Sequence, residues 1–422
     1  MQRPRGTRDL FGEELRNIRH VTNVMGNVFR CYGYAEVETP TFEYLELFKK
    51  KSGANVVKQL YAFQDKSGRW LALRPELTAP AVRLYLNQLK SAPKPLKLSY
   101  FGDCFRYEEP QARRWRQFLQ SGVEIIGSAR PEADAEVIAL SDDVMRKLGL
   151  VGYELRIGNI RLLREVLVKT GIKGDAQDPI MRAIDSRDGS RLRDELDRAE
   201  VKGRERELLK ALVELRGDVK ILDKAEKLVS GLPKARAAVQ NLRDILKRVQ
   251  LFGVEEFSVD LGIARGLEYY TDVVFEVYID GAQVAGGGRY DDLIEALGGK
   301  PCPAVGVGFG VDRIAQVLLK RKVEIARERL DCMVLPASEA MLDNCLEIVR
   351  KLRAAGLTVD VDLMGRSLTK AIAYADARGA DRVIIVGAKD LEAGKITLRD
   401  MRTGAQEEVS KQELVEKLRR LR

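Results

Sequence analysis

Two short blocks in the second half of the sequence combine the residue types needed to bind a small anionic ligand. Residues 265–270 read Arg-Gly-Leu-Glu-Tyr-Tyr, and residues 286–291 read Gly-Gly-Gly-Arg-Tyr-Asp. Arginine binds phosphate or carboxylate through paired donors, tyrosine offers an apolar ring with a polar end, and glycine lets the backbone approach a ligand closely. The blocks therefore predict a site for an anionic group beside a small polar or aromatic one. The alternative is an edge strand with a solvated arginine and a glycine-rich turn.

The shortage of histidine and the arrangement of the cysteines narrow the possible chemistry. His20 is the single histidine, and the five cysteines include no C-x-x-C pair. A histidine-based metal centre, a structural zinc site and a Ser-His-Asp triad do not fit this composition. We expect carboxylates, arginines, tyrosines and backbone amides to carry the chemistry, with or without a bound metal ion.

Length and composition predict a multidomain protein with a charged surface. The chain has 422 residues, of which 45% are hydrophobic and 32% are charged, and a chain of this length is expected to form about two to four domains. Lysine and arginine number 72 against 63 acidic residues, and the net charge of +9 is consistent with a polyanionic partner such as RNA. The sequence contains neither a run of about 18 apolar residues nor a secretory signal, which predicts a cytoplasmic protein without a membrane partner.

Hydrophobic periodicity and turn residues predict a first part built on strands and a helical part that interrupts it. We expect a helix over 10–33, a strand over 34–39, a strand at 71–73 leading into a helix capped by Thr78, and a hairpin of strands 96–107 and 117–126. A helical region over 174–253 follows, and strands return at 256–262, 272–279 and 305–310.

The last part of the chain follows a charged linker over 320–330 and alternates regularly. Strands are expected at 332–336, 357–362, 382–387 and 395–400, and helices at 339–354, 367–378 and 410–421. This alternation predicts a compact α/β domain with a largely parallel sheet.

Arginines and polar residues recur on or beside the predicted strands of the first part. Arg106, Arg265 and Arg313 each lie at a strand end or next to a glycine. Gln120 and Glu124 are four residues apart, so a strand places both on one face. The set predicts arginines for phosphate groups and carboxylates for an amine or a ring N–H.

Glycine spacing argues against two common nucleotide-binding motifs. Gly306, Gly308 and Gly310 are spaced G-x-G-x-G rather than G-x-G-x-x-G, and the neighbouring strands are expected to be antiparallel. No G-K-S or G-K-T sequence for a phosphate-binding P-loop occurs. The glycine triplet at 286–288 is expected to form a turn.

Taken together, these motifs resemble those of the histidyl-tRNA synthetases, a family of class II aminoacyl-tRNA synthetases. Pro40 resembles the proline of motif 1, residues 105–108 with 116–120 resemble motif 2, and residues 308–313 resemble motif 3. Residues 265–270 and 285–291 resemble the two histidine-specific signatures, and residues 5–9 resemble the N-terminal signature of the family. The resemblance covers essentially the whole chain.

The resemblance implies an α+β fold, in which a class II antiparallel-sheet catalytic domain with a helical insertion precedes a C-terminal α/β anticodon-binding domain. The implied domains are a first catalytic part at 1–172, an inserted helical domain at 173–254, a second catalytic part at 255–325 and the anticodon-binding domain at 330–422. It also implies a cytoplasmic homodimer whose ligands are tRNA(His), L-histidine and ATP with Mg²⁺, without zinc.

The activity implied by the resemblance is the ATP-dependent activation of L-histidine, with release of pyrophosphate, followed by transfer to the 3′ end of tRNA(His). Arg106 and Arg265 are the implied catalytic residues at the α-phosphate. Glu108 and Arg313 are implied for the rest of ATP, Glu76, Thr78 and Gln120 for the α-amino group, and Glu124, Tyr269, Tyr270 and Tyr290 for the imidazole. Because a strand turns alternate side chains to opposite faces, a packing role is the alternative for Tyr269.

The resemblance also implies contacts with tRNA. They are Gln111, Arg113 and Arg114 at the acceptor end, and Arg366 in the anticodon-binding domain. The chain departs from the family pattern at Glu109, where a basic residue is common, at Leu119, where an aromatic residue or histidine is frequent, and at Arg113, where glycine is usual. These departures concern recognition of the acceptor end more than activation.

Two alternatives belong to other functional classes. One is the synthetase-like regulatory subunit of ATP phosphoribosyltransferase, which typically lacks the anticodon-binding domain and has a degraded Arg-Gly-Leu-x-Tyr-Tyr block. The other is a noncatalytic RNA-binding module, in which the three arginines would have no catalytic use.

Overall fold

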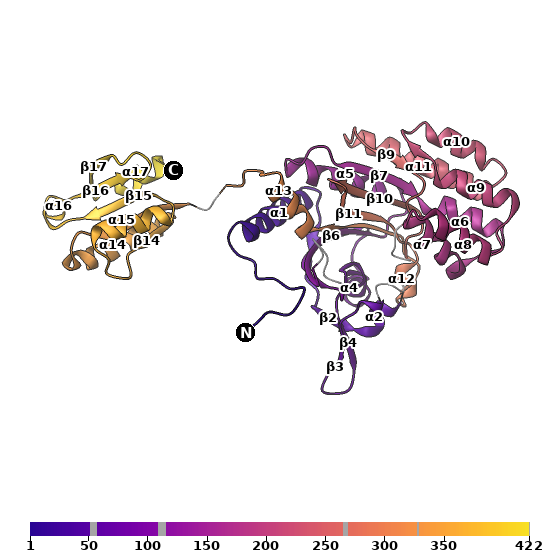
Figure 1. The fold of residues 1–422 in the computed structure, drawn as a ribbon, viewed down its shortest axis with the longest axis horizontal. Helices are drawn as coiled ribbons and strands as arrows, with labels where there is room; N and C mark the ends of the chain where they lie inside the picture. The colour runs from indigo at the N-terminus through magenta and orange to yellow at the C-terminus, as the bar shows by residue number, and fades with distance from the viewer. Residues whose placement is uncertain (51–56, 109–114, 265–268, 327–328, 422) are drawn as a thin grey trace. The chain divides into compact units, whose positions relative to one another are not determined.

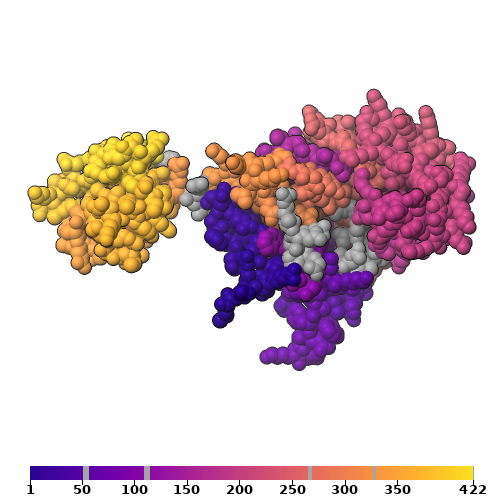
Figure 2. All heavy atoms as spheres, viewed as in Figure 1, coloured from indigo at the N-terminus to yellow at the C-terminus, as the bar shows by residue number. Residues whose placement is uncertain are grey.

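The computed structural model describes residues 1–50, 57–108, 115–264, 269–326 and 329–421 (Figure 1). The chain folds as two compact units, Met1–Ile325 and Ala326–Arg422. No helix within the described ranges is long and apolar enough to cross a membrane. Figure 2 shows the C-terminal unit in space-filling form, coloured from orange to yellow.

A nine-stranded sheet organises the first unit, in the order β1-β5-β6-β12-β11-β10-β7-β9-β8. Its strands are β1 Ala35–Glu36, β5 Leu96–Phe105, β6 Gln117–Ile126, β7 Glu154–Asn159, β8 Arg216–Gly217, β9 Ser258–Asp260, β10 Val273–Ile279, β11 Ala282–Arg289 and β12 Ala304–Gly310. The central strands from β5 to β7 in this order pair antiparallel. The predicted hairpin is confirmed, because β5 and β6 pair along their whole length, whereas the strand expected over 34–39 is reduced to β1.

Three helices cover one face of this sheet. They are α1 Gly12–Cys31, α5 Pro131–Lys147 and α13 Val311–Lys320. Helix α1 is amphipathic and buries Val21, Met25 and Phe29 at helical spacing. The ring of Phe29 lies 6.1 Å from that of Phe309 on β12, centroid to centroid. Because side chains alternate along a strand, Gly306 and Gly308 of β12 lie on the opposite face of the sheet from Phe309.

Glycines crowd that opposite face. Gly306 of β12 pairs with Glu124 of β6 on one side and with Gly288 of β11 on the other. Directly paired residues point to the same face of a sheet. The glycines therefore leave space free of side chains beside Glu124 on this face. The expected turn at 286–288 is therefore wrong, and so is the edge-strand alternative, because the triplet lies inside β11 and β11 is an interior strand.

A small three-stranded sheet and several short helical segments lie beside the main sheet. The sheet has the order β2-β4-β3, with β2 Phe42–Tyr44, β3 Ala62–Gln64 and β4 Trp70–Leu73, and the helices nearby are α2 Leu45–Lys49, α4 Thr78–Leu84 and a π-helical turn Tyr85–Leu89. Thr78 is not the predicted N-cap but the first residue of α4. The Glu76 carboxylate caps the helix instead, accepting the N–H groups of Thr78 at 2.6 Å and Ala79 at 3.0 Å.

Helices dominate the stretch between β7 and β9, as predicted. They are α6 Ile160–Lys169, a 3₁₀ turn Gly174–Gln177, α7 Asp178–Asp185, α8 Gly189–Arg198, α9 Gly203–Val213, α10 Ile221–Leu228 and α11 Pro233–Leu251. Outside this stretch, the short helix α12 Leu293–Ala296 lies between β11 and β12. The apolar repeat expected here is buried along α11, where Val239, Leu242, Ile245 and Val249 face the core.

The C-terminal unit has a five-stranded sheet in the order β14-β13-β15-β16-β17. Its elements are β13 Leu330–Pro336, a 3₁₀ turn Glu339–Met341, α14 Leu342–Ala354, β14 Val359–Val361, α15 Leu368–Ala377, β15 Ala380–Val386, α16 Ala388–Glu392, β16 Lys395–Asp400, β17 Gln406–Ser410 and α17 Leu414–Arg420. Strands β14, β13 and β15 are parallel, but β15, β16 and β17 are antiparallel. The largely parallel sheet was therefore wrong for half of the pairs, because only the short connections 387–394 and 401–405 join β15, β16 and β17, which suits antiparallel neighbours rather than a parallel crossover.

Candidate active site

A cavity of about 460 Å³ is lined by residues from the glycine-rich strands β6, β11 and β12. Ten of the residues predicted to bind ATP or histidine line it, namely Glu76, Thr78, Arg106, Glu108, Gln120, Glu124, Tyr269, Tyr270, Tyr290 and Arg313. They come from the approach to α4, the β5–β6 hairpin, the approach to β10, the end of β11 and the start of α13. Segments far apart in the sequence thus meet in a single concave site, as a small-molecule site requires.

Two glycines of β12 leave the space that side chains of β6 occupy. A Cβ atom on Gly306 would lie 1.7 Å from Oε2 of Glu124, and one on Gly308 would lie 2.7 Å from Nε2 of Gln120. The glutamate has no room if Gly306 carries a side chain. The G-x-G-x-G spacing therefore serves to admit side chains from the neighbouring strand.

Glu124 is a deeply buried carboxylate, with 1% of its surface exposed. Its Oε1 accepts a hydrogen bond from the Tyr100 hydroxyl at 2.7 Å, and its Oε2 accepts one from the Tyr290 hydroxyl. Burial raises the pKa of Glu124 to about 7, although both hydrogen bonds favour the ionised form. An N–H donor supplied by a ligand would stabilise the carboxylate further.

Glu76 is a second buried carboxylate on the cavity. Burial raises its pKa, while the N–H groups of Ala79 and Thr78 and the positive charge of Arg106 act in the opposite direction. The Thr78 hydroxyl lies 3.4 Å from that of Tyr100, which links the Glu76 region to Glu124. Two carboxylates facing one small cavity create a negative potential that suits an ammonium group.

Three tyrosines form an aromatic wall of the cavity. The ring of Tyr269 lies 4.9 Å from that of Tyr270 and 5.6 Å from that of Tyr290, centroid to centroid. The packing role kept as an alternative for Tyr269 assumed the alternation of a strand, but both tyrosines line the cavity. They lie in an irregular segment ahead of β10, where the alternation of a strand does not apply.

Arg106 follows β5 directly and is held in place from two sides. Its Nε donates to the carbonyl of Pro75 at 2.9 Å, and its guanidinium carbon lies 5.3 Å from the Phe118 ring centroid. The N–H of Glu108 donates to the carbonyl of Arg106 at 2.8 Å. A guanidinium fixed by a carbonyl and an aromatic ring loses little freedom when it binds phosphate.

Arg313 lies in the first turn of α13, beside the glycines of β12. Its Nη1 donates to the carbonyl of Gln283 at 2.7 Å. The preceding Asp312 is buried and accepts the N–H of Leu119 on β6 at 2.5 Å. Arg313 is thus anchored to both β11 and, through its neighbour, β6.

Five predicted contacts are not among the described residues that line this cavity. Arg265, Gln111, Arg113 and Arg114 fall outside the described residues, so their placement stays a prediction. Arg366 belongs to the C-terminal unit, in the turn between β14 and α15. Its guanidinium pairs with the Asp362 carboxylate and lies 4.1 Å from the Tyr374 ring centroid.

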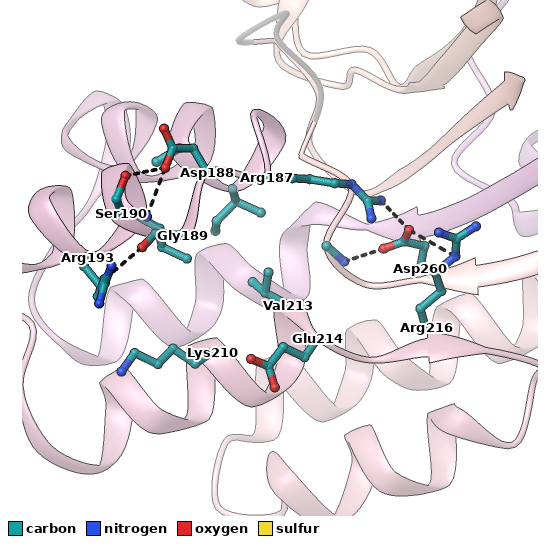
Figure 3. A pocket seen from close by; sticks show the side chains of 14 residues that line it. Arg187, Asp188, Gly189, Ser190, Arg193, Lys210, Val213, Glu214, Arg216 and Asp260 are labelled. Atoms are coloured by element: carbon teal, nitrogen blue, oxygen red, sulfur yellow. Dashed lines mark hydrogen bonds and ion pairs between the residues drawn. The ribbon is translucent and has the colours of Figure 1, made fainter. Parts of the chain in front are cut away.

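A larger cavity of about 590 Å³ lies between the helices α7 to α9 and the strands β8 and β9, and none of the predicted site residues that the structure describes lines it (Figure 3). Two of its arginines, Arg187 and Arg216, approach the buried carboxylate of Asp260 at 2.5 and 3.9 Å. Asp188 caps α8 by accepting the N–H groups of Ser190 and Arg191. These charged groups already have partners within the protein.

Sequence reasoning missed some residues that build the active-site cavity. Phe118 lies two residues before Gln120, so the same strand periodicity would have placed it on the site face. Tyr100 pairs across the hairpin with Gly122, where a Cβ atom would lie 2.6 Å from the tyrosine hydroxyl. An aromatic residue opposite a glycine was therefore the available signal for Tyr100.

Comparison with solved structures places this architecture in a known class. The crystal structure of histidyl-tRNA synthetase from Nostoc sp. PCC 7120 is similar with a TM-score of 0.83 and 25% identity, covering 100% of this chain and 99% of that chain. Apo histidyl-tRNA synthetase from S. aureus has a TM-score of 0.72 and 26% identity, and 99% of each chain is covered. The antiparallel sheet, its site and the C-terminal sheet unit define a class II aminoacyl-tRNA synthetase fold.

Sequence comparison narrows the class to one family. A model of the histidyl-tRNA synthetase family matches residues 6–314, and one of the anticodon binding domain matches residues 331–421. A histidine–tRNA ligase from Methanocaldococcus jannaschii is 44% identical over 98% of both chains. One from Thermococcus kodakarensis is 42% identical over 99% of this chain and 98% of its own length. The chain belongs to the histidyl-tRNA synthetase family.

Proposed function

We propose that this protein ligates L-histidine to tRNA(His) in two steps within the Glu124 cavity. ATP activates histidine to histidyl-adenylate with release of pyrophosphate, and the histidyl group then passes to the 3′ end of the tRNA. The supporting observation is the convergence of ten predicted ATP and histidine contacts on one cavity, together with the family membership. Its buried carboxylates and anchored arginines suit an ammonium group and a phosphate chain.

Activation needs no protein base in this site. The carboxylate of histidine is already ionised at neutral pH, so its oxygen attacks the α-phosphorus directly while the bond to pyrophosphate breaks. The task of the protein is to align the two reactants and to stabilise charge on the phosphate. Arg106 and Arg265 contact the α-phosphate, Arg313 the γ-phosphate, and Glu108 the amino group of adenine.

Histidine is selected by buried acceptors. Glu124 accepts an imidazole N–H, with Tyr269, Tyr270 and Tyr290 forming the ring pocket. An amino acid without a matching donor leaves the buried carboxylate unsatisfied, which costs far more than a missing apolar contact. Glu76, Thr78 and Gln120 bind the α-amino group.

Magnesium enters with ATP rather than in a protein cage. No group of three or more His, Cys, Asp or Glu residues that could hold a metal ion occurs in the described part of the chain. The cavity combines arginines with carboxylates, which suits ATP bound as its magnesium complex, where the ion would help to neutralise the phosphate charge.

The tRNA contacts divide between the two units. Gln111, Arg113 and Arg114 meet the acceptor end, and Arg366 meets the anticodon loop from the C-terminal unit. The stacking of Arg366 on Tyr374 and its ion pair with Asp362 hold its side chain at the start of α15. The net charge of +9 favours association with the polyanion.

The proposal extends to domain division and assembly. The catalytic parts are 1–172 and 255–325, the inserted helical domain is 173–254, and the anticodon-binding domain is 330–422. A homodimer is supported by the open face of the three-stranded sheet, where Phe42 and Tyr44 are more than half exposed. The protein acts in the cytoplasm, where its tRNA substrate is found.

One structural neighbour supports a second candidate. The solved ATP phosphoribosyltransferase regulatory subunit/histidyl-tRNA synthetase from Bacillus halodurans C has a TM-score of 0.78 and 28% identity, covering 92% of this chain and 99% of that chain. A regulatory subunit has no need of a C-terminal anticodon-binding unit, which this chain possesses at 331–421. Synthetase activity therefore remains the better-supported proposal.

Histidine-dependent ATP–pyrophosphate exchange tests the proposal, followed by charging of tRNA(His). The protein should catalyse exchange with histidine and with none of the other nineteen standard amino acids, and it should then charge the tRNA. Lack of exchange with histidine would refute synthetase activity. Exchange without charging would restrict the error to the tRNA contacts. Arg265→Ala should abolish exchange in a folded protein.

A further inference from the structure

The N-terminal residues are fixed to the rim of the active-site cavity. The carbonyl of Gly6 accepts the N–H of Arg116 at 2.8 Å, and the carbonyl of Arg116 accepts the N–H of Arg106 at 2.9 Å. Gly6 has a φ of +83°, and a Cβ atom there would lie 2.7 Å from Cδ of Arg116, so this contact depends on glycine. Two backbone hydrogen bonds therefore connect the N-terminal segment to an arginine of the cavity.

Arg8 extends this attachment through its side chain. Its guanidinium pairs with the carboxylate of Asp312, and both side chains are more than nine-tenths buried. Its Nη1 also lies 2.8 Å from Oε1 of Glu14, and its guanidinium carbon lies 4.8 Å from the Trp115 ring centroid. Asp312 and Trp115 both line the cavity. A residue near the N-terminus thus supplies a buried positive charge behind the site.

Asp312 joins two active-site elements. One carboxylate oxygen pairs with Arg8 and the other accepts the N–H of Leu119, so α13 is tied to β6. Arg313, the proposed γ-phosphate contact, is the next residue. Without Arg8, Asp312 would be a buried negative charge lacking this cation, close to the place proposed for a triphosphate.

We propose that Arg8 is a positioning residue for the ATP subsite, which holds Asp312 and therefore Arg313 and β6 in the geometry that binds the phosphates. This inference rests on the proposed synthetase function. Arg8 itself touches neither substrate. Its loss should weaken ATP binding and slow activation because Arg313 shifts and because Asp312 repels the phosphates. The histidine subsite, built around Glu124 from other contacts, should change little.

The test measures ATP–pyrophosphate exchange in the full-length protein with Arg8→Gln, varying ATP and histidine separately. We expect the KM for ATP to rise about 10- to 100-fold, with the KM for histidine within about twofold of wild type. Arg8→Lys should recover part of the loss, since it restores the charge without the forked donors or the ring stacking. Adding Asp312→Asn to Arg8→Gln should also recover ATP binding, since it removes the unpaired charge.

Arg3→Gln is the matched control, since Arg3 forms an exposed pair with Asp9 in the same segment at 3.7 Å. It should leave both KM values unchanged. A lower melting temperature for Arg8→Gln with an unchanged KM for ATP, or equal rises in both KM values, would overturn the positioning role. If Arg8→Gln does not fold, the same test is made with Arg8→Lys and with the double variant Arg8→Gln/Asp312→Asn. In each, the change in the KM for ATP is compared with the change in the KM for histidine. Absence of exchange in the wild-type protein would instead refute the proposed function.

Discussion

The two main cavities of the first unit differ in size and, more importantly, in the state of their charged groups. The larger one, between the helical region and the edge of the sheet, has about 590 Å³, against about 460 Å³ for the one on the glycine-rich face. In the larger cavity Arg187 and Arg216 share Asp260, and Asp188 caps a helix. In the smaller one the described residues that hydrogen-bond to the buried Glu124 are neutral hydroxyls, among them those of Tyr100 and Tyr290.

In this protein the proposed binding site is therefore distinguished by a buried carboxylate that can still bond a charged or N–H donor, and not by the volume of the cavity. A buried carboxylate bonded only to neutral hydroxyls has a raised pKa and gains free energy from a matching donor. A carboxylate that is already paired with arginine, such as Asp260, gains little from a ligand. The glycines of β12 extend the contrast, because the fold gives up side-chain packing there to make room for Glu124.

The largest expected effect comes from filling that room. Gly306→Ala would place a Cβ atom 1.7 Å from Oε2 of Glu124 and should reduce kcat/KM for histidine in pyrophosphate exchange by roughly 1000-fold. Gly308→Ala is the matched control, since its Cβ atom would meet the end of the Gln120 side chain, which can move. The loss there should be clearly smaller. Equal losses in both variants would remove the special role assigned to Gly306.

Removing the charge of Glu124 should have the next largest effect. Glu124→Gln keeps the shape of the side chain but weakens the hydrogen bond to an imidazole N–H, so kcat/KM for histidine should fall about 10- to 100-fold. The KM for ATP should stay nearly constant, because the proposed phosphate contacts are arginines elsewhere on the cavity. A loss confined to ATP would move Glu124 from the histidine subsite to the nucleotide.

The raised pKa of Glu124 predicts two pH effects. Below pH about 7 the free carboxyl is mostly protonated, so the KM for histidine should fall as pH rises from about 6 to 8, a range centred on that pKa. Because this folded-state pKa lies above the ordinary value of 4.5, the folded protein holds the proton more tightly, and its unfolding free energy should decrease as pH rises between the two. Denaturation of wild type and Glu124→Gln across this range measures the second effect, which the variant should lack.

Substitutions of residues that line the larger cavity should have the smallest effects on activity. Arg187→Gln removes a partner of buried Asp260, and since the arginine side chain is half exposed, it should lower the unfolding free energy by about 1 kcal/mol. Pyrophosphate exchange by the folded protein should remain within about twofold of wild type. Arg193→Gln, whose bond goes to the Gly189 carbonyl, serves as the near-neutral control. A large loss of exchange in either variant would contradict the division between the cavities.

Strong local patterns predicted several elements correctly, and weak ones failed where packing decides. The β5–β6 hairpin and the apolar repeat of α11 were found because their periodicity is long. The glycine triplet was expected to turn, but interior pairing on both sides makes it a strand. Thr78 was expected to cap α4, but the carboxylate of Glu76 accepts the free backbone N–H groups of Thr78 and Ala79 at the start of this helix instead. The short polar strand β17 has no signal apart from its pairing with β16.

The residue types of the site and the motifs that carry them could be read from the amino-acid sequence. A chain with one histidine, arginines beside glycines, and glutamine and glutamate at strand spacing already pointed to charge stabilisation without a protein base. Motif resemblance added the family, and the comparisons confirmed it.

How those residues meet follows from the folded structure and not from the local sequence. In the folded chain Gly306 lies opposite Glu124, and Tyr269 and Tyr270 both line one cavity. Arg8 pairs with Asp312, which is 304 residues further along the sequence. Contacts of such sequence separation depend on sheet register and on the packing of helices against one face. No local pattern contains that information, because burial and pairing arise only when distant segments share a core.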